Sequence, residues 1–365
     1  MAGETKTNAE QEALQAQLNV LNEQLDEIVT SRAACAPNNS DAANRFQPPA
    51  GLPDDIANGH FDPNLYVPDF NIPALAPGGG DTKPEILEKL GPLAGFIGTW
   101  ISNRFSGYNV MPLPQNTAPT GVILKNLFYY EVLTFSAIQG KVANRGGALE
   151  QDAYTIFYEQ RVFFANGPQK DELVHAENGA LLNLVMTNQG EGTLDEGAGE
   201  IYNPYLVGQQ PASRQIVKQV SVPHGNSLLA MGSVERYNGA PQIPNVNTIP
   251  KGATKAIREL YGEDTPTNLN VNPNFILRQA LCDLDVISTT AIHLDSKNHG
   301  DVGNIPFIQR HADVTQFTNS FWLSDLSDGT QQLQYTQNIS LKFNNKDNAK
   351  YTFPHVTANT LFKVS

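Results

Sequence analysis

The stretch "GPLAGFIGTW", residues 91–100, indicates how the folded body of this chain begins. A helix-like lead is followed by a Gly-x-Trp step into a strand, and the segments after it read as strands. A tryptophan this close to a chain reversal usually packs in a core, because it carries a large apolar surface. The stretch therefore predicts a small antiparallel barrel whose closed end is plugged by Trp100.

The chain after this stretch favours the same fold. Its 29 Gly and 24 Pro punctuate many short segments, which is typical of a loop-rich, mainly β protein. Strands at roughly hairpin spacing favour a sandwich or a closed antiparallel barrel. The predicted strands are Gly98 to Phe105, Leu124 to Ile138, Ala153 to Phe164, Asp171 to Glu177, Ala180 to Thr187, Arg214 to Val222, Ser227 to Tyr237, Val286 to Leu294, Gln316 to Leu326, Leu333 to Phe343 and Tyr351 to Lys363.

Helices are predicted in few places. Within the body, Asn272 can cap and Pro273 can open a helix through NFILRQAL, and a second short helix through ATKAIRELYG ends at Gly262. At the N-terminus, apolar residues spaced by 4, 3, 4 and 3 form the seam of a short coiled coil. These seam residues are Leu14, Leu18, Leu21, Leu25 and Ile28.

The chain divides into three regions by composition. Residues 1–32 are predicted to form an N-terminal amphipathic helix, which packs either on its own domain or on a second copy in a homo-oligomer. Residues 33–86 are rich in Pro, Asn, Asp and Gly, so an extended arm is expected there. Residues 87–365 form the predicted barrel.

Charge and composition exclude several classes of protein. The 37 acidic and 24 basic residues give a formal charge of -13, which disfavours nucleic acid and anionic membranes as partners. The N-terminal residues lack the apolar core of a signal peptide, and no run of about 18 apolar residues occurs, so a cytoplasmic location is expected. The chain also lacks the spacing motifs of a zinc cluster, P-loop, dinucleotide site or serine hydrolase.

The stretch "YTFPHVTANTL", residues 351–361, raises the question of chemistry. Side chains alternate along a strand, so Phe353, His355 and Thr357 share one face with Asn359 and Leu361. A neutral imidazole on an inward face is a good iron ligand when its other nitrogen is hydrogen-bonded. The alternative is a histidine that is satisfied within the core or at the rim.

Two further histidines stand beside features of candidate sites. His224 in "SVPHGNSLLA" lies between Pro223 and Gly225, which predicts either a bend that aims the ring inward or a turn with an exposed ring. His175 in "HAENG" is followed by Glu177, and this pair is either structural or functional.

Six motifs resemble, in the same order, segments of the nitrobindins, haem-binding barrels of the calycin group that includes fatty-acid-binding proteins and lipocalins. They are "FIGTW" at 96–100, "EVLTF" at 131–135, "HAENG" at 175–179, "FWL" at 321–323, "LQYTQ" at 333–337 and "FPHVTANTL" at 353–361. The resemblance covers most of residues 87–365 and implies an antiparallel calycin-like β-barrel with an N-terminal helix and extended arm.

The resemblance also implies a function. It places haem b in the barrel, with His355 as the ligand of the iron and His175 near the pocket. The alternation of residues 351–361 adds Phe353 and Thr357 beside His355, and an inward His224 would be either a polar group on the distal side or a second axial ligand. The open iron position would bind nitric oxide or react with oxidants, which implies peroxynitrite isomerase-like or peroxidase-like chemistry.

Two alternatives remain open from the sequence. This chain is longer than the family's compact barrels, with added segments around residues 107–122, 188–213, 238–285 and 295–315 that either roof the pocket or fill it. A filled pocket favours a haem-free barrel that binds an apolar small molecule. The N-terminal seam favours a scaffold or assembly protein that makes its contacts through the arm.

Overall fold

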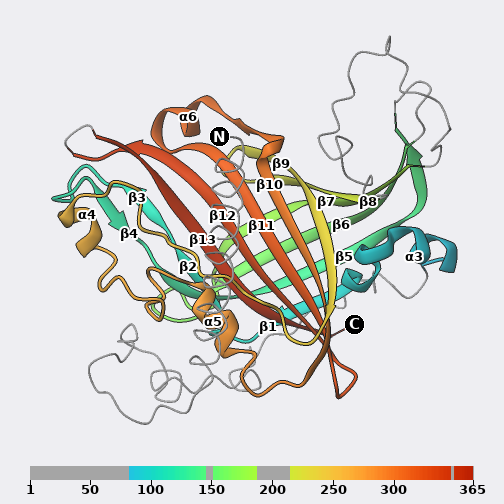
Figure 1. The fold of residues 1–365 in the computed structure, drawn as a ribbon. Helices are drawn as coiled ribbons and strands as arrows, with labels where there is room; N and C mark the ends of the chain where they lie inside the picture. The colour runs from blue at the N-terminus through green and yellow to red at the C-terminus, as the bar shows by residue number, and fades with distance from the viewer. Residues whose placement is uncertain (1–81, 145–150, 187–213, 347–348, 365) are drawn as a thin grey trace, which may run out of the picture.

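The computed structural model describes residues 82–144, 151–186, 214–346 and 349–364, most of which form β-strands (Figure 1). The strands are β1 (Gly98–Ser102), β2 (Gly107–Val110), β3 (Pro112–Pro114), β4 (Val122–Leu124), β5 (Leu127–Ala143), β6 (Gln151–Phe164), β7 (Leu173–Met186), β8 (Arg214–Val222), β9 (Asn226–Asn238), β10 (Val286–Asn304), β11 (Asp313–Leu326), β12 (Gln331–Asn344) and β13 (Lys350–Lys363). The helices are α3 (Pro84–Leu90), the 3-10 helix η1 (Gly91–Phe96), α4 (Lys255–Glu259), α5 (Asn274–Gln279) and α6 (Pro306–His311).

The long strands close into a ten-stranded antiparallel β-barrel. Each strand from β5 to β13 pairs with the next one in sequence, and β1 joins the two ends because it pairs with both β5 and β13. Strands β10–β13 cross the front in Figure 1, with β5–β8 behind them. The predicted mainly β fold with an antiparallel barrel is confirmed.

The strand predicted at Gly98 to Phe105 ends at Ser102 as β1, and a further strand, β2, begins at Gly107. A turn in which the Ser106 amide donates to the Asn103 carbonyl separates the two pieces. Both pieces pair with β5 and β13, β1 near the end of β13 and β2 near its middle. Together they fill one strand position of the barrel.

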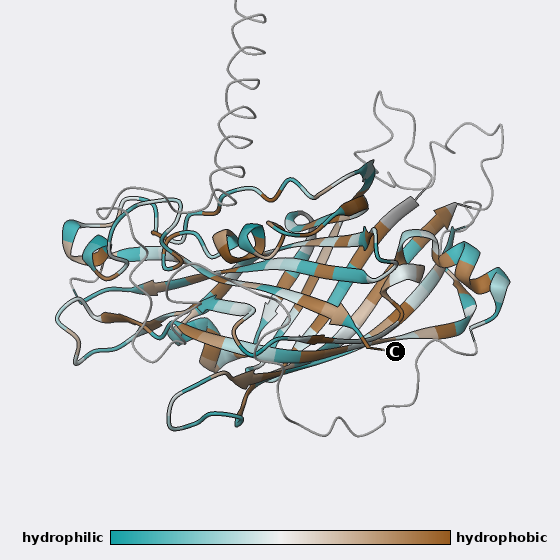
Figure 2. Ribbon diagram, turned by 90° about the horizontal axis from the view of Figure 1, so that it is seen from below, coloured by the Kyte–Doolittle hydropathy of each residue, from teal (hydrophilic) through white to brown (hydrophobic). Residues whose placement is uncertain are grey.

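Figure 2 shows hydrophobic and hydrophilic residues interspersed along the strands of the barrel. Because side chains alternate between the two faces of a strand, one face of β13 lies in the barrel interior. Phe353, His355 and Thr357 pair directly with Leu341, Ile339 and Gln337 of β12. Directly opposed residues of an antiparallel pair lie on the same face. The inward face predicted from residues 351–361 is therefore present.

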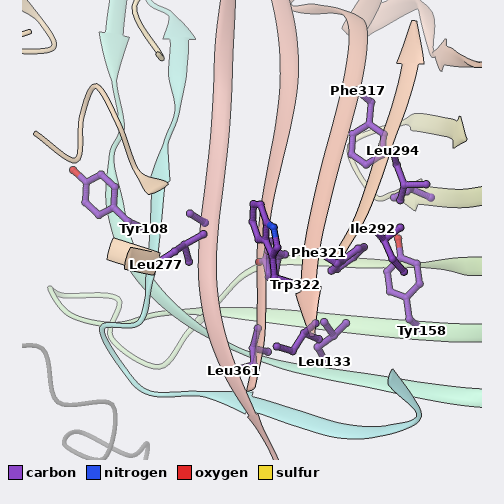
Figure 3. Close-up of a cluster of buried hydrophobic side chains, with 14 of the residues drawn as sticks. Tyr108, Leu133, Tyr158, Leu277, Ile292, Leu294, Phe317, Phe321, Trp322 and Leu361 are labelled. Carbon is purple, nitrogen blue, oxygen red and sulfur yellow. The ribbon is translucent and has the colours of Figure 1, made fainter. Parts of the chain in front are cut away.

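One end of the barrel is closed by the segment that precedes β1. Trp100 is fully buried, and its Nε1 donates a hydrogen bond of 2.7 Å to the Phe96 carbonyl. Leu90, Leu93 and Phe96 of α3 and η1 are also fully buried, and the Phe96 ring packs edge-on against two other rings of the core. The predicted tryptophan plug is confirmed. Figure 3 shows neighbouring core side chains such as Leu133, Phe321 and Leu361, each from a different strand.

Replacing Trp100 by phenylalanine is expected to lower the free energy of unfolding by about 1 to 3 kcal/mol. The buried Phe96 carbonyl would lose its donor, and the smaller ring would leave space in the plug. Denaturant unfolding followed by circular dichroism measures the change. An unchanged midpoint and slope would show that the indole nitrogen contributes nothing to the closed end.

The long connection between β9 and β10 covers the outside of the barrel. The Gln334 amide on β12 donates to the Leu277 carbonyl at 2.9 Å, and the Thr336 hydroxyl donates to Asn274 at 2.6 Å. Gln334 and Thr336 flank Tyr335, which faces the barrel interior, so their side chains point to the outer face of β12. The segment 238–285, including α4 and α5 near the predicted positions, thus packs on the outer face and leaves the interior open.

At two places where the sequence predicted that a strand ends, the strand continues. The strands predicted at Asp171 to Glu177 and Ala180 to Thr187 form the single strand β7, where Gly179 allows the Gln219 carbonyl to approach to 1.9 Å from the position a Cβ would occupy. Strand β10 continues past Leu294 to Asn304 into the segment predicted as a loop. A register shift between Asp295 and Gly300 absorbs the extra residues, so polar side chains there do not prevent pairing with β9.

The predicted N-terminal helix and all but the end of the arm lie outside the described residues. The arm was predicted to reach residue 86, whereas α3 begins at Pro84. Within the described ranges, no helix is long and apolar enough to cross a membrane.

Candidate functional site

A cavity of 380 Å³ opens inside the barrel at the end opposite the tryptophan plug. Three histidines that are far apart in sequence line it: His175 on β7, His224 between β8 and β9, and His355 on β13. The remaining lining residues are Asn109, Met111, Leu113, Lys125, Leu127, Tyr129, Gln160, Val162, Val174, Glu177, Val222, Asn226, Leu228, Ile308, Ala312, Val314, Tyr335, Gln337, Ile339, Leu341 and Thr357. We refer to it as the three-histidine cavity.

Parts of the inserted segments build the wall of this cavity. Met111 and Leu113 come from the segment 107–122, and Ile308 and Ala312 come from α6 and the residue after it. These residues line the cavity and leave it open, so the inserted segments that the structure describes do not fill the pocket. The segment 188–213 lies outside the described residues.

His355 is held as a neutral imidazole at the cavity wall. Its Nε2 lies 2.9 Å from Oδ1 of Asn109 on β2, and because an amide oxygen only accepts, Nε2 is the donor. The lone pair of the neutral ring then resides on Nδ1. Burial, followed by the nearby His175 and His224, lowers the pKa of His355 to about 4. The ring is therefore uncharged at neutral pH, as a metal ligand must be.

His175 and His224, which also line the cavity, have neighbouring rings. Their centroids are 5.4 Å apart, and Nε2 of His175 lies 3.5 Å from Oε2 of Glu177. The predicted turn at Pro223–Gly225 is present, with Gly225 at a φ of 99°. His224 is thus both exposed at a turn and part of the cavity lining. Partial desolvation of the ring, followed by the electrostatic effect of the neighbouring His175, lowers the pKa of His224.

The other two predicted site residues differ in position. Thr357 lines the cavity beside His355. Phe353 faces inward on the same strand but is not among the lining residues of the cavity. Its ring is fully buried, and the ring centroids of Phe353 and Phe343 are 4.4 Å apart in a stacked pair, so it packs in the core next to Leu341 of the cavity wall.

Glu177, which lines the cavity floor, belongs to a buried ion pair, and sequence reasoning missed the other member of the pair. Nζ of Lys218 lies 3.7 Å from Oε1 of Glu177, and both side chains are almost fully buried. Lys218 also donates to Asn319 at 2.8 Å and is surrounded by the rings of Tyr158, Phe317 and Phe321. Burial alone would raise the pKa of Glu177, but Lys218 and then His175 hold it at about 2.

A signal for this pair was present in the sequence. Lys218 shares one face of β8 with Ile216, Val220 and Val222, because side chains two residues apart in a strand point the same way. The pattern therefore places a lysine on an apolar, inward face. A charged residue in that position is unusual without a partner. Glu177 was noticed only as the neighbour of His175.

A second polar group lies directly behind the floor, around Glu131 of β5. The Tyr335 hydroxyl donates to Oε2 of Glu131 at 2.9 Å, and the amide of Gln160 donates to the same oxygen. The Tyr129 hydroxyl lies 2.9 Å from that of Tyr335. Glu131 is fully buried, and burial raises its pKa to about 7. Sequence reasoning used Glu131 and Tyr335 only as parts of the motifs EVLTF and LQYTQ, and it gave Tyr129 and Gln160 no role beyond their strands.

The donor set of the cavity limits the metal chemistry that it could support. Within the described ranges, no group of three or more His, Cys, Asp or Glu side chains is arranged to hold a metal ion. A bare ion would therefore lack a cage. Haem iron takes four ligands from the porphyrin and needs as little as one from the protein, which a single neutral histidine can supply.

No family model and no curated protein sequence matches this chain. Among solved structures, the crystal structure of Rv2717c from M. tuberculosis is 14% identical, with a TM-score of 0.37, over 78% of this chain and 100% of that one. RV0216 from Mycobacterium tuberculosis, a double hotdog fold, is 8% identical with a TM-score of 0.12, over 78% and 82% of the two chains. Neither likeness is close enough to carry an argument, so the fold assignment rests on the strand pairing itself: a closed, ten-stranded antiparallel barrel.

Proposed function

We propose that the three-histidine cavity binds b-type haem and that His355 is the ligand of its iron. The observation that carries the proposal is the state of His355: a neutral imidazole in a cavity wall, with one ring nitrogen engaged by Asn109. A hydrogen bond from the second nitrogen orients a histidine ligand and fixes its tautomer. The nitrobindin-like motifs of the sequence lead to the same residue.

The rest of the cavity supports this ligand. Its volume of 380 Å³ falls within the range of small-molecule sites, roughly 300 to 1,000 Å³. Its wall above the polar floor is mainly apolar, which suits the flat face of a porphyrin and excludes water. These apolar lining residues are Met111, Leu113, Leu127, Val162, Val174, Val222, Leu228, Ile308, Val314, Ile339 and Leu341.

The side chains of this chain would have distinct parts in such a site. His355 would bind the iron, Asn109 would orient His355, and the pair His175 and His224 would meet molecules that enter the cavity. Bound haem would supply an iron able to take up nitric oxide or to react with oxidants such as peroxynitrite.

Titration of the purified protein with haem tests the proposal. We expect a saturable Soret band at one haem per chain. Ile339, which pairs with His355 across β12 and β13, offers a variant that fills the cavity. Ile339→Trp should prevent haem binding. Ser340→Trp should not, because the side chain of residue 340 points to the outer face of β12. Absence of a saturable band in the unaltered protein would overturn the proposal.

A second candidate is a haem-free barrel that binds an amphipathic small molecule. The observation that favours it is the contrast between the apolar wall and the polar floor, where Glu177, Gln337 and Thr357 lie beside two tyrosine hydroxyls. Displacement of a fluorescent fatty-acid analogue by oleate would detect such binding. Displacement that persists in His355→Ala, with no Soret band in the unaltered protein, would favour this candidate over haem.

A further inference from the structure

Two buried glutamates in the barrel have opposite surroundings. Glu177 faces two bases, with Nζ of Lys218 at 3.7 Å and Nε2 of His175 at 3.5 Å. The side-chain contacts of Glu131 are with neutral groups, the amide of Gln160 and the hydroxyl of Tyr335. A carboxylate without a cation is costly in a buried site, so the two carboxyl groups are expected to carry different charges at the same pH.

Glu131 is connected to the three-histidine cavity by side chains that line it. Tyr335, Gln160 and Tyr129 are all lining residues. The Tyr335 hydroxyl bridges the two sides, at 2.9 Å from Oε2 of Glu131, 2.9 Å from the Tyr129 hydroxyl and 3.0 Å from Nε2 of Gln160. Glu131 itself is fully buried and is not a lining residue. The Tyr335 hydroxyl is the proton-bearing group that lies between the Glu131 carboxyl and the cavity.

We propose that Glu131 is the proton reservoir of the three-histidine cavity, and that Tyr335 passes its proton to an anionic or basic atom of a molecule bound at the floor. In that step the O–H bond of Glu131 breaks as its proton moves to the Tyr335 oxygen. The Tyr335 O–H bond breaks as the hydroxyl proton moves to the bound atom. Glu131 becomes a carboxylate, the bound molecule gains one proton, and no electrons are transferred.

The groups that face Glu131 agree with this assignment. Tyr129 of its own strand, Tyr335 of β12 and Gln160 of β6 are in the hydrogen-bonded group, and Asn359 of β13 lies beside it. The charged groups nearest to it are Glu177 of β7, which disfavours a second negative charge, and Lys218 of β8, which is already paired with Glu177. The pKa of about 7 that burial gives Glu131 is consistent with a carboxyl group that holds its proton up to neutral pH.

The first experiment measures the proton in the unliganded protein. In protein labelled with ¹³C at the glutamate carboxyl carbon, Glu131 is identified as the resonance missing from Glu131→Gln. We expect it to titrate near pH 7, well above the value of about 4.3 for a solvated glutamate. Should Glu131→Gln fail to fold, the resonance is identified by its shift in Tyr335→Phe. Titration that is complete below pH 6 would overturn the proposal.

The second experiment tests the connection to the cavity. Tyr335→Phe removes a donor that favours the carboxylate, so the pKa of Glu131 should rise, whereas Tyr129→Phe leaves that contact in place and should change it less. Equal shifts in the two variants would overturn the role of Tyr335.

A third measurement joins this assignment to the proposed function, on which its role toward a ligand rests. The visible spectrum of haem-loaded protein should change with pH at the midpoint found for Glu131. The change should be lost in Glu131→Gln and kept in Glu159→Gln, which removes an exposed carboxylate of β6. A haem spectrum that responds identically in both variants would overturn the coupling. Failure of haem to bind would overturn only the proposed function, since the carboxyl titration is measured without haem.

Discussion

Replacing His355 by alanine is expected to lower the affinity for haem by more than about 100-fold. Removing a residue that merely orients a metal ligand typically costs 10-fold to 100-fold in affinity, and loss of the ligand itself should cost more. The Soret band of the variant, titrated with haem as for the unaltered protein, measures this change. The variant should fold, because His355 lines a cavity and its side chain is hydrogen-bonded to Asn109 at the cavity wall.

The control for this variant is His224→Ala, which removes a ring from the same cavity. His224 lies exposed at the turn between β8 and β9, so its loss should alter the binding of small molecules to the iron far more than the retention of haem. Asn109→Ala should give an intermediate loss of about 10-fold to 100-fold. Equal haem affinity in His355→Ala and the unaltered protein would show that His355 is not the ligand of the iron. Equal losses in the two histidine variants would instead indicate that both rings bind it.

The barrel could be predicted from local patterns because these patterns decide which face of each strand is buried. Alternation in residues 351–361 was sufficient to place Phe353, His355 and Thr357 on the inner face. The tryptophan plug was predictable because a Gly-x-Trp step at a chain reversal offers few other places for an indole. The order of the motifs related His175 to His355, and the Pro223–Gly225 bend was the local signal for His224. No local pattern relates these three residues to one another, because they are so distant in sequence.

The remaining features depend on partners that a local pattern does not contain. The length of β10 is set by its pairing with β9, which tolerates polar residues and a bulge that read as a loop. The role of Lys218 depends on Glu177, which comes from the neighbouring strand, and on aromatic rings from β6 and β11. Glu131 meets Tyr335 only because β5 and β12 face each other across the interior. Such contacts are set by barrel closure and not by sequence neighbours.

Replacing Lys218 by methionine is expected to lower the free energy of unfolding by about 3 to 5 kcal/mol at neutral pH. Methionine fills a similar volume among the surrounding rings, but Glu177 would be left as a buried carboxylate without its ammonium partner. In this variant the folded-state pKa of Glu177 should rise above its unfolded value. Its contribution to stability would then be greatest at low pH and be lost as the pH rises through that folded pKa, so the defect should shrink in acid.

The double variant Lys218→Met with Glu177→Leu separates the cost of an unpaired charge from the cost of lost packing. Replacing both members of a buried pair by apolar residues is often neutral or stabilising, so the double variant should recover most of the stability lost in Lys218→Met. Gln219→Met, one residue along β8 on the exposed face, controls for the substitution itself and should change the free energy of unfolding by less than about 0.5 kcal/mol. Denaturant unfolding at pH 5 and pH 8 measures all three variants. A double variant as unstable as Lys218→Met would mean that the lysine acts through its stem and its contacts with the rings, and that Glu177 has no need of a cation.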